Sequence, residues 1–367
     1  MTTGPRVTVL VPVYNRARFI GRAIESVLGQ SFGDFELLLV DDGSIDDSVA
    51  VIRRYSDPRI RLIENGLNRG IPLTRSIGIA EARGRYIAML DSDDEAPAFR
   101  LERQVAVLDR HADIAVVGGW AREIDAQGQR RGGVKMLPLA PNELEARLLF
   151  RTCHHHSSTM ARAAVLREHG YRGAFPVCED YDLFSRIAER HRLANLPRVL
   201  LHRRIHPGRI TCDRAAQVRA NNVAIARRRV AALGLPDDDA TIAHHVLLAR
   251  LKKERVTPDR DFLESASAWL ERVAAANDKA EIYCPRGLAA TLGQLWAIAC
   301  LQARPAIGAA AFARFRSSPL RDAVPASLRA NIAFALGKRG PSSRYEAPLA
   351  APLLTAEAIA PMPSPVT

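Results

Sequence analysis

The chain has 367 residues, enough for one large domain or for a core domain with an appended region. Its hydrophobic share of 47% and charged share of 25% are ordinary for a soluble globular protein. The net charge of +12 favours polyanionic partners, such as nucleotide phosphates or an anionic membrane surface. Aromatic residues make up only 6%, and basic residues form no compact run, which argues against a nucleic-acid-binding protein.

The five cysteines are scattered and form no C-x-x-C pair, which argues against a zinc ribbon and against a secreted disulfide framework. The first residues lack the apolar core of a signal peptide, and no apolar run is long enough to span a bilayer. We therefore expect a cytoplasmic protein.

The first ninety residues alternate between strand and helix patterns. Runs of apolar and β-branched residues predict strands over residues 7–13, 35–40, 60–63 and 86–90. Helical spacing of apolar residues predicts helices over residues 19–28, 48–55 and 72–83. This alternation predicts an α/β sandwich with a mainly parallel central sheet.

Polar residues directly follow three of the predicted strands, as Tyr14-Asn15, Asp41-Asp42 and Asp91-Ser92-Asp93. Ligands of parallel sheets bind outside the carboxyl ends of the strands, so we expect these residues to meet in one crevice. Clustered carboxylates raise each other's pKa, and a divalent cation with oxygen ligands relieves that cost and brings substrate phosphates. The alternative is a strand that runs into a solvated acidic turn.

Several motifs occur together, in a consistent order and spacing. They are Val11-Pro12-Val13-Tyr14-Asn15, Asp41-Asp42-Gly43-Ser44, Asn68-Arg69-Gly70 with Arg75 and Gly78, Asp91-Ser92-Asp93-Asp94, His156-Ser157-Ser158-Thr159-Met160, Glu179-Asp180-Tyr181-Asp182-Leu183 with Arg186, and Leu200-Leu201-His202-Arg203-Arg204-Ile205-His206. As a set they resemble the family 2 glycosyltransferases over roughly residues 5–210, although each motif alone is weak.

This resemblance implies the GT-A fold, a Rossmann-like nucleotide-diphospho-sugar transferase sandwich. It also implies an inverting, metal-dependent transfer of a sugar from a UDP- or dTDP-sugar to a hydroxyl of a glycan or lipid-linked acceptor. Such a reaction would serve cell-surface polysaccharide, O-antigen or glycan synthesis.

The donor side of the crevice follows from the first motifs. The residues expected to bind the nucleotide sugar are Pro12, Val13, Tyr14, Asn15, Asp41, Asp42, Arg75, Asp91 and Ser92. Asp41 or Asp42 would accept a hydrogen bond from a uracil or thymine imide, and Arg75 would reach the base or a phosphate. The alternatives are an ordinary turn with a helix cap for the aspartates, and a solvated helix residue for Arg75.

The resemblance also assigns the metal ligands and the base. Asp93 would bind Mg²⁺ or Mn²⁺, with His206 as a further metal or diphosphate contact. Asp180 would be the catalytic base, and the dipole of the helix that begins there stabilises its ionised form. Asp94 is interpreted as a cap of a helix over residues 99–108.

Three consecutive histidines, His154-His155-His156, suggest zinc together with Cys153. Neighbouring residues on a strand point to opposite faces, so the three cannot bind one ion from a strand. We expect His156-Ser157-Ser158 to line the acceptor side of the crevice instead.

Two further function classes stay open beside the glycosyltransferase. A nucleotidyltransferase also combines an α/β sheet with acidic metal ligands, but residues 11–18 contain no glycine-rich phosphate loop with lysine. A non-catalytic sugar-nucleotide-binding protein would have no need of Asp93 and Asp180.

The C-terminal third is rich in alanine, leucine and arginine, and its spacing predicts helices over residues 214–233, 239–255, 259–277 and 285–302. We divide the chain into a catalytic domain (1–213), a helical region (214–340) and a disordered, proline-rich tail (341–367). A basic amphipathic stretch over residues 309–339 suits either a membrane surface or protein packing. Gly132-Gly133 is expected in a loop. The oligomeric state stays open.

Overall fold

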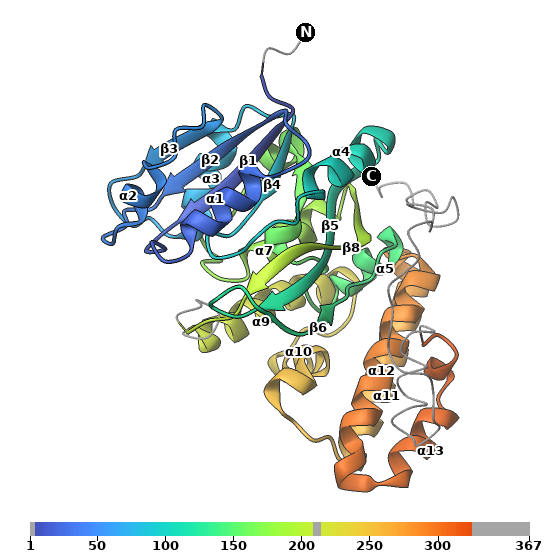
Figure 1. Ribbon diagram of the computed structural model, residues 1–367. Coiled ribbons are helices and arrows are strands. Elements are labelled where there is room, and N and C mark those ends of the chain that lie inside the picture. Colours follow the sequence, from blue (N-terminus) through green and yellow to red (C-terminus); the bar gives the residue numbers. More distant parts are fainter. Residues whose placement is uncertain (1–3, 208–213, 325–367) are drawn as a thin grey trace. The chain divides into compact units, whose positions relative to one another are not determined.

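The computed structural model describes residues 4–207 and 214–324 (Figure 1). The chain divides into two compact units. The first unit comprises Met1–Pro141 and Thr152–Val218, and the second comprises Asn142–Arg151 and Arg219–Thr367. The domain boundary predicted at residue 213 stays a prediction, and the predicted tail lies outside the described residues.

The first unit is built on an eight-stranded sheet. Its strands are β1 (Val7–Val13), β2 (Phe35–Asp41), β3 (Ile60–Glu64), β4 (Tyr86–Met89), β5 (Ile114–Ile124), β6 (Arg130–Lys135), β7 (Met160–Arg162) and β8 (Arg192–Arg204). The order is β3-β2-β1-β4-β7-β5-β6, and β8 pairs with β5. Strands β1 to β4 pair in parallel, as does β8 with β5, whereas β7 and β6 run antiparallel to their neighbours. The predicted α/β sandwich with a mainly parallel sheet is confirmed.

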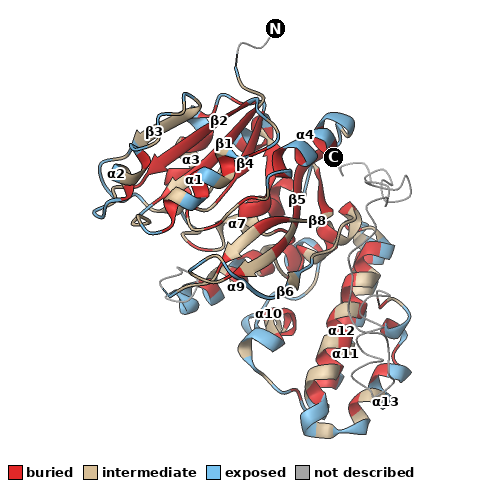
Figure 2. Ribbon diagram, viewed as in Figure 1, coloured by how far each residue is buried: buried red, intermediate tan, exposed pale blue. Residues whose placement is uncertain are grey.

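Helices cover both faces of the parallel strands. The helices of this unit are α1 (Ile20–Leu28), α2 (Ser48–Ile52), α3 (Ile71–Glu81), α4 (Arg100–Arg110), α6 (Ala163–His169) and α7 (Glu179–Ile187), with a 3₁₀ turn over His156–Ser158. Ile20 and Ile24 of α1 join the core cluster of β1 and β2, and these strands are coloured as buried in Figure 2. On the opposite face α3 packs so closely that a Cβ at Gly78 would lie 2.2 Å from Cδ1 of Leu10.

The expectation of a loop at Gly132-Gly133 is wrong. Both glycines lie within β6, which pairs with β5 on one side and ends the sheet order. Glycine marks turns because of its backbone freedom, and β6 uses the same freedom inside a strand: Gly132 has φ 63° where the register between β5 and β6 shifts. The local pattern therefore misses a strand that its partner specifies.

The second unit is helical. It contains α5 (Pro141–Arg147), α9 (Ala215–Ala232), α10 (Asp239–Glu254), α11 (Arg260–Ala280), α12 (Pro285–Ile307), α13 (Ala309–Ser317) and a 3₁₀ turn over Pro319–Arg321, of which α5 and α9 begin in the first unit. The predicted helices of this region are confirmed, and residues 325–339 of the predicted amphipathic stretch lie outside the described residues. No described helix is long and apolar enough to cross a membrane.

Residues 142–151 join the core of this unit although they precede it by far in the sequence. Leu149 and Phe150 are buried in the same cluster as Trp269 and Trp296. His245 is fully buried there: its Nε2 lies 2.9 Å from the Leu149 carbonyl, its Nδ1 accepts from Trp269 Nε1 at 3.1 Å, and its ring stacks on Phe150.

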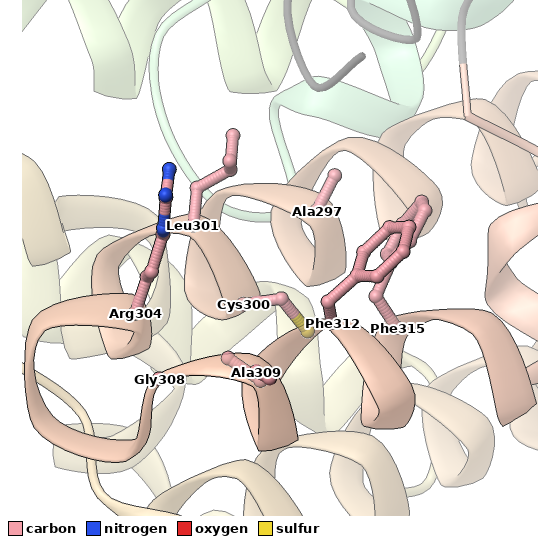
Figure 3. A pocket seen from close by; sticks show the side chains of 9 residues that line it. Ala297, Cys300, Leu301, Arg304, Gly308, Ala309, Phe312 and Phe315 are labelled. Atoms are coloured by element: carbon pink, nitrogen blue, oxygen red, sulfur yellow. The ribbon is translucent and has the colours of Figure 1, made fainter. Parts of the chain in front are cut away.

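An apolar cavity of about 350 Å³ lies within the same unit (Figure 3). Its lining includes Cys300, Arg304, Phe312 and Phe315, and burial raises the pKa of the Cys300 thiol to about 12. The cavity contains none of the residues that the sequence predicts for donor, metal or base.

Candidate functional site

The loops that follow β1 and β2 are held together by direct hydrogen bonds. The backbone N–H of Asn15 donates to Ser44 Oγ at 2.9 Å, and the N–H of Ile45 donates to Asn15 Oδ1 at 2.9 Å. Asn15 has φ 52°, a left-handed conformation that asparagine tolerates better than most residues. Tyr14 next to it is 40% exposed. The loops after β1 and β2 therefore lie in direct contact.

The two aspartates after β2 have different surroundings. Asp42 accepts from Asn65 Nδ2 at 3.1 Å and from the backbone N–H groups of Arg69 and Gly70 at 2.9 Å, which engages both of its oxygens. Asp41 accepts through Oδ2 from the N–H groups of Gly43 and Ser44. Its Oδ1 is buried and has no hydrogen-bond partner among the described residues. Asp41 thus retains a buried acceptor, whereas Asp42 holds the loop after β3.

Gly43 is required in this turn on two grounds. Its φ is 75°, and a Cβ there would lie 2.6 Å from the backbone carbonyl carbon of Leu67. The turn after β2 and the loop after β3 are therefore in contact through backbone, which any side chain at position 43 would prevent.

Asp93 and His206 lie together although they are far apart in the sequence. Nε2 of His206 is 2.9 Å from Oδ2 of Asp93, and the imidazole packs against the ring of Phe19 with centroids 4.6 Å apart. Nε of Arg204 donates to the Asp93 carbonyl at 2.9 Å, and Nε of Arg16 lies 3.7 Å from the Asp93 carboxylate.

The Asp93–His206 pair fits a divalent cation. Octahedral Mg²⁺ with ligands at about 2.1 Å separates neighbouring ligand atoms by roughly 3 Å, which matches the observed spacing of the two side chains. A carboxylate with an imidazole also suits Mn²⁺. Two protein ligands leave positions for diphosphate oxygens, as such ions normally require.

Asp94 does not cap a helix, contrary to expectation. Helix α4 begins at Arg100 and has no side-chain cap, whereas Asp94 is buried and accepts from the Arg204 N–H at 2.8 Å. Burial, with the charges of Asp93 and Asp91, raises the pKa of Asp94 well above its usual range. Asp94 therefore supports the acidic loop from behind. Ser92 in the same loop is also buried.

Arg75 is neither solvated nor directed to open solvent. It is 4% exposed, its Nη2 lies 2.8 Å from Oδ1 of Asp91, and its Nη1 pairs with Glu179. The guanidinium carbon stands 5.7 Å from the centre of the Tyr171 ring. Arg75 thus connects the acidic loop after β4 with the first turn of α7.

Asp180 occupies the first turn of α7, as predicted. Burial and the neighbouring charge of Glu179 raise the pKa of Asp180 to about 7, and Arg75 opposes this rise. The backbone N–H of Tyr181 in the first turn lowers this pKa, in the direction expected at a helix N-terminus, but burial and the adjacent carboxylate outweigh it. A pKa near neutrality suits a general base.

The three consecutive histidines contact three different groups. His154 Nδ1 lies 2.7 Å from Asn195 Oδ1, His155 Nε2 lies 3.1 Å from the Lys135 carbonyl, and His156 Nε2 lies 2.6 Å from the Tyr171 hydroxyl. They do not converge on one point, so the geometry gives no support to a shared zinc site. Only His156 joins the network around Arg75, through Tyr171.

No role is assigned from the sequence to Arg16, Arg204, Tyr171 or Glu179. Arg16 directly follows the first motif, and Arg204 and Glu179 lie within later ones, so their positions were available as a signal. Tyr171 lies between motifs in an irregular segment, and only the folded chain brings it under Arg75.

Three comparisons bear on this site. The model of the family described as glycosyl transferase family 2 matches residues 8–169. The putative glycosyltransferase EpsE of Bacillus subtilis is 36% identical over 196 residues, which cover 52% of this chain and 69% of EpsE. The succinoglycan biosynthesis protein ExoO of Rhizobium meliloti is 40% identical over 157 residues, which cover 41% of this chain and 45% of ExoO.

Among solved structures, S. aureus TarS 1–349 in complex with UDP has a TM-score of 0.52 at 18% identity, and the match covers 84% of this chain and 87% of that one. At this identity the likeness concerns the fold alone. Together with the sheet described above, it confirms the expected GT-A class with additional C-terminal helices.

Proposed function

Because the chain belongs to glycosyl transferase family 2, and is thus a glycosyltransferase, we propose that the residues at the ends of β1, β2 and β4 form a site that transfers a sugar from a UDP- or dTDP-sugar to an acceptor hydroxyl with inversion. One observation carries this proposal. Two ion pairs, Asp91–Arg75 and Arg75–Glu179, connect the acidic loop after β4 to helix α7, which carries Asp180.

On the donor side, Asp41 is the better candidate for base recognition. Its Oδ1 is a buried acceptor without a partner among the described residues, and an imide N–H of uracil or thymine is a donor that would satisfy it. The backbone of Pro12, Val13, Tyr14 and Asn15 would line the base and ribose. Asp91, whose side chain is 38% exposed, would contact the ribose.

Asp93 and His206 would hold Mg²⁺ or Mn²⁺ with the diphosphate. When bound, the ion supplies positive charge against the charge that develops on the departing nucleoside diphosphate. Arg16, beside the Asp93 carboxylate, is placed to add a second positive charge on the same side. Arg204 fixes the backbone of the acidic loop after β4 by the hydrogen bond that its Nε donates to the Asp93 carbonyl.

Asp180 would take the proton of the acceptor hydroxyl as its oxygen attacks the anomeric carbon. The new bond forms opposite the bond to the diphosphate, which breaks with its electron pair on the leaving oxygen, so the configuration inverts. A base with a pKa of about 7 is ionised above that pH and protonated below it. We expect transfer to fall about tenfold for each pH unit below 7.

The proposal is tested by titrating the purified protein with UDP, dTDP and GDP, each with and without Mn²⁺, in a calorimeter. We expect metal-dependent binding of UDP or dTDP, loss of the metal dependence in D93N, and unchanged nucleotide binding in D180N. D180N should lose transfer with a donor that the parent uses. Absence of binding to every nucleotide would refute the donor site, and full turnover by D180N would refute the base.

D180N also separates the remaining alternative. A non-catalytic sugar-nucleotide-binding protein would bind donor but show no transfer in the parent, whereas a transferase loses an existing activity. A nucleotidyltransferase is not supported, because the chain belongs to another transferase family.

The acceptor is proposed to be a glycan or a lipid-linked glycan of a cell-surface polysaccharide, by similarity to ExoO. A lipid-linked acceptor suits peripheral membrane contact. Helix α13 carries Arg314 and Arg316, with Phe312 partly buried beside Arg316. Flotation of the full chain with vesicles of anionic or neutral lipid tests this contact. We expect the protein to float with the anionic vesicles and not with the neutral ones. If it floats with neither kind of vesicle, the membrane contact is excluded.

A further inference from the structure

Arg75 is a buried charge of the candidate site, and two carboxylates neutralise it. Asp91 pairs with one terminal nitrogen at 2.8 Å, and Glu179 pairs with the other. The Glu179 side chain is 12% exposed and the Arg75 side chain 5%. Breaking such a pair leaves an uncompensated buried charge, so the geometry around Arg75 is strongly constrained.

Glu179 and Asp180 are neighbours in the first turn of α7, yet they differ in partners. Glu179 is engaged by Arg75, whereas Asp180 forms no ion pair with any of the described residues. Cys178, which precedes them, has φ 61° and caps the helix in the left-handed conformation. The start of α7 is therefore held by two features, a special backbone turn and the Glu179–Arg75 pair.

Four groups act on Asp180 from the surrounding elements. Glu179 lies beside it in α7, Arg75 comes from α3, Asp91 follows β4, and Tyr171 follows α6. The two carboxylates raise the pKa of Asp180 and the guanidinium lowers it, with burial as the largest cause of the rise. Burial also raises the pKa of Tyr171, so its hydroxyl carries no charge near neutrality.

We propose that Glu179 and Arg75 are positioning residues for Asp180: their ion pair holds the first turn of α7, and Asp91 joins that turn to the loop after β4 through Arg75. This inference rests on the proposed function for its meaning, since it concerns the residue assigned there as base. Neither side chain needs to touch the reacting atoms. Glu179 acts as a fixed negative neighbour, and Arg75 as the positive charge that moderates it.

The test measures the proton affinity of Asp180 through stability, so that no donor or acceptor is needed. An aspartate whose folded pKa exceeds its unfolded value costs stability as the pH rises through that range, and the cost becomes constant above the folded pKa. Replacing it by asparagine removes this cost. The gain in thermal midpoint of D180N over its parent should grow from about pH 4 and level off near pH 7.

The same comparison is then made in altered backgrounds. With E179Q, which keeps an oxygen for Arg75 but removes the charge, the gain should level off about one pH unit lower. With R75M it should level off at higher pH. E179D restores the charge. The pH at which the gain from D180N becomes constant, here called the levelling point, should then return towards 7. E168Q, an exposed carboxylate of α6, is the matched control and should leave it unchanged.

The outcome that overturns the inference is a levelling point that stays in place in both E179Q and R75M, or that moves in the same direction in both. A merely structural role would lower all midpoints without moving that point. If R75M does not fold, the E179Q and E179D pair decides alone. Failure of nucleotide binding would refute the proposed function without altering this result, so the two failures are distinguishable.

Discussion

Asp41 and Asp42 show how neighbouring residues of one type acquire different work. Both carboxylate oxygens of Asp42 accept hydrogen bonds, from Asn65 and from the backbone of the loop after β3. In Asp41, one oxygen accepts hydrogen bonds within its own turn, and the other is buried without a partner among the described residues. A buried polar atom left in this way costs stability unless a ligand supplies the hydrogen bond. The pair therefore divides into a loop anchor and a candidate ligand contact.

This division predicts opposite phenotypes for two matched variants. In D41N the amide oxygen can keep the turn while the NH₂ group replaces the free acceptor, so UDP affinity should fall about ten- to a hundredfold with little change in stability. In D42N an NH₂ group meets backbone N–H donors, so unfolding free energy should fall by about 1–3 kcal/mol. Calorimetric UDP titration and urea unfolding of both variants check this. Equal loss of affinity in both, with equal stability, would contradict it.

Much of the site could be predicted at this scale, because motif residues at the ends of parallel strands are brought together by the sheet itself. Asp93 and His206 are an example: the resemblance assigns both to one metal site, and in the structure their side chains lie 2.9 Å apart. The sequence could not tell the roles of Asp41 and Asp42 apart, nor those of Glu179 and Asp180. Asp42 is distinguished by its bonds to the loop after β3, and Glu179 by its ion pair with Arg75 of α3. These partners are distant in the sequence.

At the scale of elements, the fold depends on one close approach between α3 and β1. Gly78 faces Leu10 where a Cβ would lie 2.2 Å from a methyl carbon of the leucine, with a second at 2.8 Å. Leu10 is fully buried, so its side chain has little room to yield. Helix α3 carries Arg75 one turn earlier, and any displacement at Gly78 would reach that residue.

G78A should therefore lower the free energy of unfolding by about 1–3 kcal/mol, the usual cost of overpacking. The control is G133A in β6, where an added Cβ meets nothing within 4 Å. We expect that variant to lie within about 0.5 kcal/mol of the parent. Urea unfolding of both checks the difference, and an unaffected G78A would show that α3 can shift without cost.

Element prediction succeeded over the first ninety residues and in the C-terminal helices, where local periodicity coincides with burial. It left residues 110–155 without assignment and mistook part of β6 for a loop. Strand β7 has only three residues, and β6 is exposed along most of its length. Such strands exist because β4 and β5 provide partners, and a partner's hydrogen bonds leave no local pattern.

At the scale of the whole molecule, each unit has its own hydrophobic core. The second unit takes in residues 142–151, and His245 is central to their attachment. Both ring nitrogens are engaged, one with the Leu149 carbonyl and one with Trp269, so the buried ring is neutral. Burial lowers the pKa of His245 to about 4.

This histidine makes the second unit sensitive to acid. Its folded pKa lies below the unfolded value of 6.5, so its contribution to stability is present above pH 6.5 and is lost as the pH falls towards 4. The slope should approach about 1.4 kcal/mol per pH unit between these limits. H245Q should be less stable at pH 7 but lack this slope. Thermal unfolding between pH 7 and 4 measures both, and parallel curves would contradict the assignment.

The attachment of residues 142–151 has a consequence during synthesis. Leu149 and Phe150 leave the ribosome well before Trp269 and Trp296, the residues whose cluster they join. At about 5–20 residues per second, the wait is on the order of ten seconds. During that time the nascent chain carries a ten-residue segment whose apolar residues Leu149 and Phe150 have no partner yet made, inserted in the middle of the sequence of its first unit. Completion of the core of the second unit in the cell is thus timed by translation of the helices that follow.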